Sequence, residues 1–569
     1  MIMSCDFIRR IGYFIGILFF MQLGIASATD GGDNSLIVTY VDPLRKVLQS
    51  DVSFPSDSAL ASVARGETAT LQFVVRSSSR LKNLTVSIVP PAFGNNKLTN
   101  STVRYVGYVK VSSLAKNGSR DRLNPSNGMF PDVLLEQSSI DVPQNTSQPV
   151  WISVNIPVSA VPGLYKGQVV LDGQSGGTNV HEVRSFAIQV YPVQVKSTSL
   201  NVSLWPSIDK FGQLNDGQPV PNFTDQYWQL NKVMAAMMAK YRQTVVLIYP
   251  LPLTQYTLNN GKYTFDFTNF DKMIDIYRAA GALKRIEGGF LGGRWGPGGW
   301  DADYGFFFYM PQGNKFTERT AKMDNPDLVN FYSQFIPALV SHLKSRNLLS
   351  IYYQHIGDEP IPKNSPTYIA FSKFIKQLSP ELKTIDAVQT TNVADNVDVV
   401  VPQLDDFGKN YNLYSKKIAA GKEVWFYTCW KPQGEYANRF IEQQALKTRY
   451  LHLINFKYNL KGYLHWAYNQ WTNNPYGEAS KVLSSNSETL PGGDSWIVYP
   501  KKGGFLASIR LEAMRDGIVD YELLKMLSAK NPQLSNTIVN RLVKDFDSYE
   551  MDIPTFRKNR VQLLAALSK

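Results

Sequence analysis

Two adjacent acidic residues, Asp358 and Glu359, follow an apolar segment and a glycine, and Pro360 comes directly after them. Carboxylates at the buried end of a strand are costly unless they are paired or used in chemistry. Side chains alternate along a strand, so these two neighbours diverge. One can protonate the leaving oxygen of a glycoside while the other reaches a group on the opposite side of the anomeric carbon. The pair therefore indicates glycoside hydrolysis, with a solvated loop start and incidental acids as the alternative.

Adjacent carboxylates can serve a substrate-assisted glycosidase. The ordinary retaining arrangement places a nucleophile and an acid about 5–5.5 Å apart, and substrate-assisted enzymes are its exceptions. In substrate assistance the 2-acetamido oxygen of the sugar attacks C1. The enzyme then needs one carboxylate to orient the acetamido N–H and one acid to protonate the leaving oxygen, and Asp358 and Glu359 can supply both.

Aromatic, basic and amide side chains lie at other predicted strand ends. Pyranose rings present C–H faces that can stack on indole and phenol rings, and hydroxyls that need polar partners. The candidate substrate-binding residues are Trp205, Arg294, Trp295, His355, Tyr427, Trp430, Trp466, Tyr468, Asn469 and Trp471. Core packing competes with this interpretation for several of them, and His355 either supports the acid pair or is a satisfied core histidine. Cys429 is predicted to be a buried small hydrophobe and not a nucleophile.

Strand and helix patterns alternate after about residue 200, which predicts a (β/α)8 barrel of the TIM type. The eight predicted strands are 200–206, 243–250, 285–291, 350–357, 384–390, 397–402, 423–429 and 461–468. Predicted helices between them include 225–241, 269–280, 326–346, 366–378 and 438–458. Catalytic groups of this fold sit where strands run into the following loops. A doubly wound open sheet is the alternative, but no G-x-G-x-x-G follows the first strand.

The rest of the chain shows other patterns. Short alternating β runs with regular Gly and Pro punctuation predict a β-sandwich before the barrel, and helix formers predict a helical tail after it. The predicted organisation is a signal peptide (1–28), a β-sandwich (29–195), a catalytic barrel (196–507) and a C-terminal helical extension packed on the barrel (508–569). Structural ion pairs within the tail and from the tail to the barrel are expected from Arg510, Glu512, Arg515, Asp516 and Asp520.

The N-terminal residues have the pattern of a secretory signal. Arg9 and Arg10 precede an apolar run over 11–25, and the small residues of 26–28 follow as a cleavage site. The run is short for a transmembrane span and no second such stretch follows, so we expect a secreted or lumenal protein, extracellular or lysosome-like, with no membrane span after cleavage. An uncleaved membrane anchor is the alternative. N-glycosylation sequons start at Asn83, Asn100, Asn117, Asn145, Asn201 and Asn222, of which Asn201 falls in a predicted strand.

Composition narrows the class of protein. Hydrophobic residues make up 44% and charged residues 19% of the 569, which describes a globular chain with a sizeable core and excludes a disordered or fibrous one. Two cysteines exclude a disulfide scaffold and a thiolate zinc site. The net charge of +12 is spread along the chain without a basic run, which argues against a nucleic-acid partner.

Three segments together resemble glycoside hydrolase family 123. They are HIGDEP at 355–360, GYLHWAYNQW at 462–471, and GGDSWIVYP at 492–500 followed by the tail helix over 508–524. The C-terminal region also resembles domain of unknown function 4091. The resemblance covers about 200–530 and implies exo-acting, retaining removal of terminal β-linked N-acetylgalactosamine (GalNAc) through an oxazoline intermediate. It implies that Asp358 stabilises the acetamido group, that Glu359 is the general acid and then the base, and that no metal or cofactor takes part.

Two other functions remain open from the sequence. A retaining glycosidase of different specificity would use one carboxylate as a direct nucleophile. A non-catalytic carbohydrate-binding protein would keep the aromatic residues and tolerate the loss of Glu359, although the acid pair argues against it. The glycan substrate is the expected partner, and the sequence predicts no oligomeric state.

Overall fold

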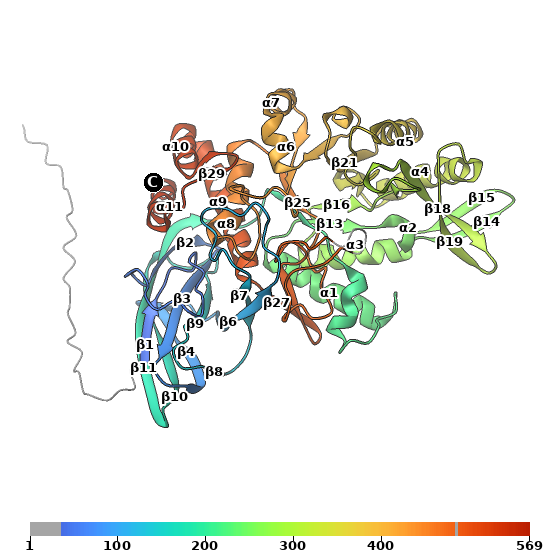
Figure 1. The fold of residues 1–569 in the computed structure, drawn as a ribbon. Coiled ribbons are helices and arrows are strands. Elements are labelled where there is room, and N and C mark those ends of the chain that lie inside the picture. The colour runs from blue at the N-terminus through green and yellow to red at the C-terminus, as the bar shows by residue number, and fades with distance from the viewer. Residues whose placement is uncertain (1–35, 484–487) are drawn as a thin grey trace, which may run out of the picture.

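The computed structural model describes residues 36–483 and 488–569, so the predicted signal peptide and Cys5 lie outside the described residues. Figure 1 shows two parts side by side: the N-terminal strands form mainly antiparallel sheets, and most of the remaining chain forms a parallel sheet surrounded by helices. The last helices return to the N-terminal part, where α11 contacts β2 and β11.

Two sheets pack face to face in the N-terminal part. The first has the order β1 (Leu36–Tyr40), β3 (Thr68–Ser77), β9 (Gln148–Asn155), β6 (Ser101–Val111) and β7 (Gly128–Leu135). The second has the order β2 (Leu60–Arg65), β11 (Thr178–Gln194), β10 (Gly163–Ser175), β4 (Leu81–Phe93) and β5 (Asn96–Lys97), with β8 (Ile140–Val142) beside β4.

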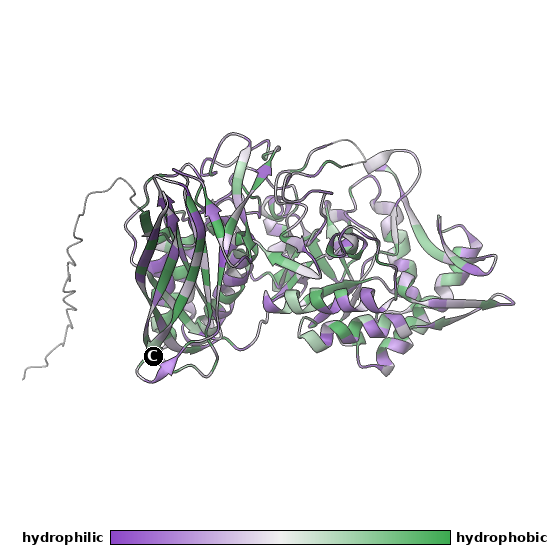
Figure 2. Ribbon diagram, turned by 90° about the horizontal axis from the view of Figure 1, so that it is seen from below, coloured by the Kyte–Doolittle hydropathy of each residue, from purple (hydrophilic) through white to green (hydrophobic). Residues whose placement is uncertain are grey.

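Alternating side chains explain why these strands form a sandwich. Tyr165, Val169 and Leu171 of β10 point inward, and polar residues between them face solvent. They share one core with Leu71 and Phe73 of β3 in the other sheet. Figure 2 shows this alternation of apolar and polar residues along the strands.

The second part is built on a parallel sheet of nine strands. Their order is β23 (Glu423–Val424), β22 (Val399–Pro402), β21 (Lys383–Val388), β20 (Tyr352–Gln354), β16 (Arg285–Gly288), β13 (Val245–Ile248), β12 (Asn201–Leu204), β25 (Gly462–His465) and β24 (Phe426–Tyr427). The two end strands, β23 and β24, are consecutive in the chain and flank Trp425, so the sheet is nearly closed. The sequence predicted eight strands, and the count differs because the predicted strand 423–429 is divided at Trp425.

Helices connect most of these strands and cover the outside of the sheet (Figure 1). They are α1 (Asp225–Lys240), α2 (Pro250–Leu253), α3 (Thr268–Ala280), α4 (Pro326–Ser345), α5 (Ser365–Leu378), α6 (Leu404–Lys409), α7 (Tyr411–Ala419) and α8 (Ala445–Lys457). The predicted helix 438–458 begins only at Ala445. Asn438 instead donates to the carbonyls of Cys429 and Pro432 in the preceding loop, and Arg439 donates to the carbonyl of Asp494.

Short elements lie on the loops between strands. Antiparallel hairpins are formed by β14 (Gln255–Asn259) with β15 (Lys262–Asp266) and by β26 (Val498–Lys501) with β27 (Gly504–Ala507). A small sheet contains β17 (Gly292–Arg294), β18 (Tyr304–Gln312) and β19 (Lys315–Ala321). Short 3-10 helices are η1 (Ile208–Leu214), η2 (Gly299–Asp301), η3 (Leu349–Ile351) and η4 (Thr391–Val393).

The C-terminal residues form three helices and one hairpin. They are α9 (Ile509–Lys530), α10 (Pro532–Leu542), β28 (Val543–Asp545) with β29 (Ser548–Tyr549), and α11 (Ile553–Leu567). The side chain of Ser508 accepts a hydrogen bond from the backbone N–H of Leu511 and so caps α9. Most of α9 is buried, because it packs against α8 on one side and reaches β7 of the sandwich on another.

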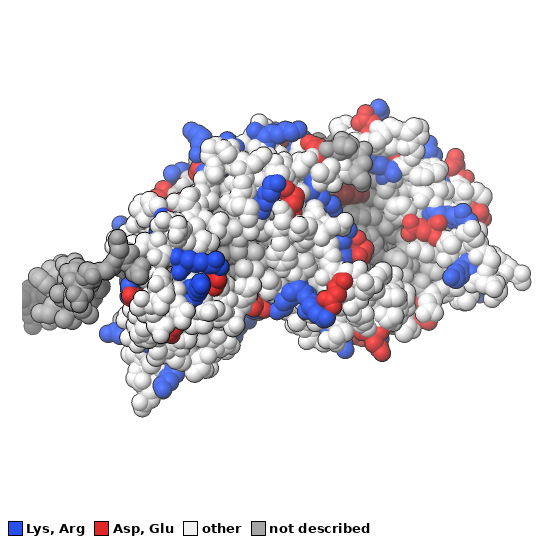
Figure 3. Space-filling model, turned by 60° about the horizontal axis from the view of Figure 1, so that its bottom comes forward, with Lys and Arg blue, Asp and Glu red and all other residues white. Residues whose placement is uncertain are grey.

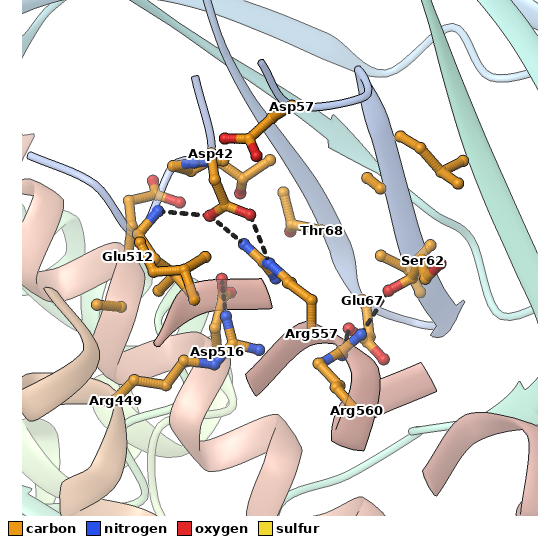
Figure 4. Close-up of a pocket in the computed structure, with 18 of the residues that line it drawn as sticks. Asp42, Asp57, Ser62, Glu67, Thr68, Arg449, Glu512, Asp516, Arg557 and Arg560 are labelled. Atoms are coloured by element: carbon orange, nitrogen blue, oxygen red, sulfur yellow. Dashed lines mark hydrogen bonds and ion pairs between the residues drawn. The ribbon is translucent and has the colours of Figure 1, made fainter. Parts of the chain in front are cut away.

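Ion pairs join the sandwich to the C-terminal helices. A cavity of about 260 Å³ lies there. Arg557 of α11 binds both oxygens of Asp42 at 2.7 and 2.8 Å, and Arg560 binds Glu67 at 2.5 Å; Figure 4 labels these residues. Arg449 of α8 also contacts Asp516 at 3.3 Å across the same cavity. The contacts bring together three segments that are far apart in the sequence.

The predicted ion pairs of α9 are present, and one of them joins the helix to the N-terminal sandwich, which was not expected. Arg515 binds Glu512 within the helix at 2.6 Å, and Asp520 binds Arg449 of α8 at 2.6 Å. Arg510 binds Asp132 in β7 through two bonds of 2.7 and 2.8 Å, and both side chains are fully buried. This pair ties α9 to the sandwich, which the spacing along the helix did not indicate.

Charged residues are dispersed over the face shown in Figure 3, as the sequence predicts. In Figure 3, Lys and Arg are interspersed with Asp and Glu over the visible face, and no large patch of one sign gathers there. Asn201 is buried in β12, where its amide donates to the carbonyl of Lys461, so this sequon is inaccessible in the folded chain. None of the helices in 36–483 and 488–569 combines the length and apolar character that crossing a bilayer requires.

The Asp132–Arg510 pair allows a test of how the two parts are joined. Asp132→Asn keeps the side-chain volume but leaves a buried guanidinium without its charge partner, so we expect unfolding to become about 3–5 kcal/mol easier. Chemical denaturation measures the change. Asp141→Asn, which breaks the exposed Arg80–Asp141 pair in the same sandwich, is the matched control and should leave the midpoint nearly unchanged. Equal small shifts in both variants would contradict a joining role for Asp132.

Candidate active site

A cavity of about 400 Å³ opens where the strands of the parallel sheet run into their following loops. This is the end of a barrel-like sheet at which such folds place their chemistry. Among the described residues that line it, the only carboxylates are Asp358 and Glu359. The aromatic residues of the lining are Trp205, Tyr249, Trp300, Tyr427, Trp430 and Trp466.

The acid pair sits on a tight backbone turn after β20. Gly357 is required just before it, because a Cβ there would lie 2.6 Å from the ring of Tyr304. Glu359 has a φ of 47°, in the left-handed region that L-residues other than Asn and Asp rarely adopt. Its position before Pro360 restricts the backbone further. The surrounding structure must therefore hold this turn in place.

Hydrogen bonds from two side chains hold the turn. Arg294 donates from Nη1 to the carbonyl of Asp358 at 3.0 Å and from Nη2 to the carbonyl of Glu359 at 2.6 Å. The hydroxyl of Tyr304 donates to the same carbonyl of Asp358 at 2.6 Å. Arg294 thus contacts the backbone of the pair and leaves the carboxylates facing the cavity.

Burial disfavours charge on both carboxyl groups. It raises the pKa of Asp358 to about 7, with the nearby Glu359 adding to the rise and with Arg294 and His355 opposing it. Burial likewise raises the pKa of Glu359, while hydrogen bonds from Tyr427 and Gln389 oppose that rise. The Tyr427 hydroxyl donates directly to Oε1 of Glu359. Asp358 is therefore poised to exchange a proton near neutral pH.

A buried histidine lies beneath the pair. Nδ1 of His355 is 2.8 Å from Asp386, and its Nε2 is 3.5 Å from Glu287. Burial opposes the charged imidazole, but hydrogen bonds to these two carboxylates raise the pKa of His355 to about 9. Glu287 also accepts a 2.7 Å bond from the indole N–H of Trp205, which lines the cavity. His355 is thus a charged group behind Asp358 and lies outside the cavity lining.

The indole of Trp466 is fixed from behind by a third acid. Its Nε1 donates to both oxygens of Asp494, at 3.2 and 3.3 Å. Burial raises the pKa of Asp494 to about 7, although Arg439 and the Trp466 bond oppose the rise. Cys429 also lines the cavity, where burial raises the pKa of its thiol well above its ordinary value and keeps it protonated.

The structure divides the predicted substrate-binding residues into two groups. Trp205, Tyr427, Trp430 and Trp466 line the cavity together with the acid pair. The residues that it places elsewhere are Arg294, Trp295, His355, Tyr468, Asn469 and Trp471.

The second group has other contacts. Trp471 is buried and donates to the carbonyl of Val498 at 2.7 Å, and Tyr468 is also buried in the core. Asn469 bonds to the backbone N–H and C=O of Ser207, a residue of the lining, at 2.8 and 3.0 Å. Trp295 is 45% exposed on the loop after β17. None of these side chains lines the cavity, and of those described here only Asn469 bonds to a residue that does.

Several lining residues were not predicted. Tyr249 directly follows β13, and attention to each strand end would have found it. Gln470 lies within the quoted segment 462–471 but was not chosen. Trp300 belongs to the same glycine-rich stretch as Trp295, and no sequence signal distinguishes the two. Within the described ranges, no three His, Cys, Asp or Glu side chains are grouped so that they could hold a metal ion.

Comparison of the sequence with family profiles and of the structure with solved structures identifies the family of the chain. The sequence profile described as glycoside hydrolase 123, catalytic domain, matches residues 214–527, and that of the glycoside hydrolase 123 N-terminal domain matches 50–173. A family 123 glycoside hydrolase from Clostridium perfringens, studied for glycolipid glycan hydrolysis, has a TM-score of 0.71 and 18% identity over 94% of this chain and 97% of that chain. At this identity the likeness shows a shared fold.

Two other solved structures are far less similar. A GH39 enzyme from Xanthomonas axonopodis pv. citri has a TM-score of 0.34 and 13% identity over 56% of this chain and 67% of that chain. A GH10 xylanase from Thermobacillus composti has 0.29 and 10% over 56% and 96%. The comparison with curated proteins finds no match. Because the catalytic-domain profile covers more than half of the sequence, the chain belongs to glycoside hydrolase family 123 and is a glycoside hydrolase.

Proposed function

We propose that this enzyme removes terminal β-linked GalNAc from glycoconjugates with retention of configuration, through attack by the substrate's own 2-acetamido oxygen. The observation that carries the proposal is the adjacent acid pair in a cavity with an aromatic lining. Glycans of glycolipids are candidate substrates, because the similar Clostridium perfringens enzyme was studied on them. The basic and apolar N-terminal residues support a secreted or lumenal location.

The acid pair supports substrate assistance over a direct nucleophile. A direct mechanism uses two carboxyl groups that flank the scissile bond. Here both lining carboxylates come from consecutive residues of one turn, and no third acid is among the described lining residues. A nucleophile supplied by the substrate removes the need for a carboxylate on the opposite face.

The surroundings of each acid suit a different role. His355 and Arg294 limit the rise in the pKa of Asp358 to about 7, so its ionised form is available from about neutral pH upward. The ionised carboxylate accepts the acetamido N–H and stabilises the developing positive charge. Glu359, whose pKa is raised by burial, protonates the leaving oxygen and later accepts a proton from water. Trp205 and Trp466 supply ring faces for the sugar.

The finer organisation of the chain is part of this proposal. Counting β23 and β24 as one interrupted strand makes the parallel sheet an eight-stranded (β/α)8 barrel. The barrel spans 196–507, with the sandwich before it and the helical extension of 508–569 packed on it. Residues at the ends of β12, β13, β20, β21, β24 and β25 then line the same cavity, as expected for the chemistry of such a barrel.

Replacing each acid separately tests the two roles. Glu359→Gln removes the proton donor, so hydrolysis of glycosides with poor leaving groups should fall about 10²–10⁴-fold, and activated aryl glycosides should lose less. Asp358→Asn should impair both kinds of substrate, because the acetamido group is no longer oriented. Steady-state kinetics on aryl β-GalNAc, β-GlcNAc and β-galactosides measures this. Equal, mild losses for both variants on all substrates would remove the pair from the mechanism.

A GalNAc-thiazoline inhibitor tests the nucleophile. It mimics the oxazoline and should bind at least about 10²-fold more tightly than GalNAc itself, as expected for an analogue of a reaction intermediate. Binding to Asp358→Asn should be much weaker, because the ring nitrogen loses its carboxylate partner. Inhibition constants decide the matter: thiazoline affinity no better than that of GalNAc favours a carboxylate nucleophile.

The raised pKa of Asp358 predicts a pH-dependent cost in stability. The folded protein holds this proton up to about pH 7 and the unfolded chain only to about 3.8, so stability from this group is lost as the pH rises between these values. Asp358→Asn has no carboxyl group at this position and therefore does not lose stability in this way as the pH rises. Its thermal midpoint minus that of the wild type should increase from pH 4 to 7 and then level off. Asp358→Ser should show the same trend, and a flat difference for both variants would refute it.

A further inference from the structure

Arg294 contacts two parts of the active site at once. Its guanidinium lies 3.5 Å from the ring centre of Trp300, and its Nε donates to the carbonyl of Trp300 at 2.8 Å. Nη1 and Nη2 donate to the carbonyls of Asp358 and Glu359. One planar group therefore joins the loop after β17 to the turn that carries the acid pair.

Each nitrogen of the Arg294 guanidinium donates a hydrogen bond to the protein backbone. Nε, Nη1 and Nη2 each have an acceptor within 3.0 Å, and all three acceptors are backbone carbonyls. The side chain is absent from the cavity lining, whereas Trp300 lines the cavity and is 50% exposed. Three of its five N–H donors are thus directed at backbone, and its effect on substrate passes through Trp300 or the acid pair.

The backbone that Arg294 binds is one that needs support. Glu359 has a φ of 47° and precedes a proline, and residues in such sparsely populated conformations persist only when their surroundings hold them. The loop on the other side is also permissive, since Gly296 and Gly298 have φ values of 93° and 119°. A planar fork with several donors in fixed geometry suits this position, and a lysine ammonium does not reproduce it.

We propose that Arg294 is a positioning residue that holds the Asp358–Glu359 turn and the Trp300 side chain as one unit, so that the cavity wall and the two carboxylates keep a fixed relation. This inference rests on the proposed function only in taking the acid pair as catalytic. It changes the sequence-based expectation that Arg294 binds substrate directly. Trp300, which the sequence did not single out, becomes part of the same unit.

Kinetics of Arg294→Lys separates positioning from direct binding. The variant keeps a positive charge but loses the fork, so we expect kcat to fall about 10²-fold, as for a misplaced catalytic group, with KM within about threefold of the wild type. Arg319→Lys is the matched control, because Arg319 is an exposed arginine of β19 in the same small sheet and should change neither constant. A raised KM with unchanged kcat would assign Arg294 to substrate binding and overturn the proposal.

Three further variants keep the test decisive if Arg294→Lys folds poorly. Trp300→Ala removes the stacking partner from an exposed position and should lower kcat about 10-fold, whereas Trp300→Phe, which keeps a ring face, should restore most of it. Arg294→Ala should regain activity when guanidinium ion is added, and added ammonium ion should not replace it. Unchanged kcat in Trp300→Ala together with no rescue by guanidinium would refute the proposal.

The same measurements keep this inference separate from the proposed function. The sugar preference and thiazoline response of the wild-type enzyme report on the proposed function. The kcat ratio of Arg294→Lys to wild type, on whichever aryl glycoside the wild type hydrolyses, reports on Arg294. A wild type that prefers another sugar leaves that ratio interpretable, and a ratio near one overturns the positioning role alone.

Discussion

The active site depends on keeping two neighbouring carboxylates at the end of a buried strand. Burial disfavours charge on Asp358 and Glu359 and raises the pKa of both. Positive charge on Arg294 and His355 opposes that rise at Asp358, and hydrogen bonds from Tyr427 and Gln389 oppose it at Glu359. Arg294 acts on both acids, whereas His355 acts on Asp358 and the Tyr427 and Gln389 hydrogen bonds act on Glu359, so the two environments differ in part.

Three buried ionisable residues lie next to the cavity but are not part of its lining. His355, Asp386 and Glu287 come from three adjacent strands, β20, β21 and β16, or the residue after them, and all three are buried. Replacing such buried groups by apolar ones is often neutral for stability, so stability alone does not account for them. Their contacts to Trp205 and their charge beside Asp358 give them a function in arranging the site.

The sandwich is joined to this region by buried polar contacts. Asp132 binds Arg510, which donates to the carbonyl of Gly493 at 2.8 Å, and the next residue, Asp494, holds the indole of Trp466. The cavity wall thus rests on a helix that the sandwich anchors. A loss of these contacts would affect the cavity wall at Trp466 as well as the overall stability.

Local sequence determined much of the molecule. The period-2 and helical patterns predicted β strands before about residue 195 and alternating strands and helices after it, and the family resemblance was confirmed by the matching profiles. The expectation that functional groups lie where barrel strands run into their loops identified the acid pair and the cavity-lining residues Trp205, Tyr427, Trp430 and Trp466. These features could be predicted because periodicity and strand ends are properties of neighbouring residues.

Only the tertiary structure decided which distant residues meet. Arg294 lies more than sixty positions before the carbonyls that it binds, so its type and spacing could not show that it contacts backbone instead of substrate. Trp300 faces the cavity and Trp295 does not, although both come from one glycine-rich segment. The predicted strand 423–429 is divided because its two halves pair with different strands, β23 with β22 and β24 with β25. Contacts across the fold outweigh local preference wherever a buried polar group or a strained turn must be satisfied.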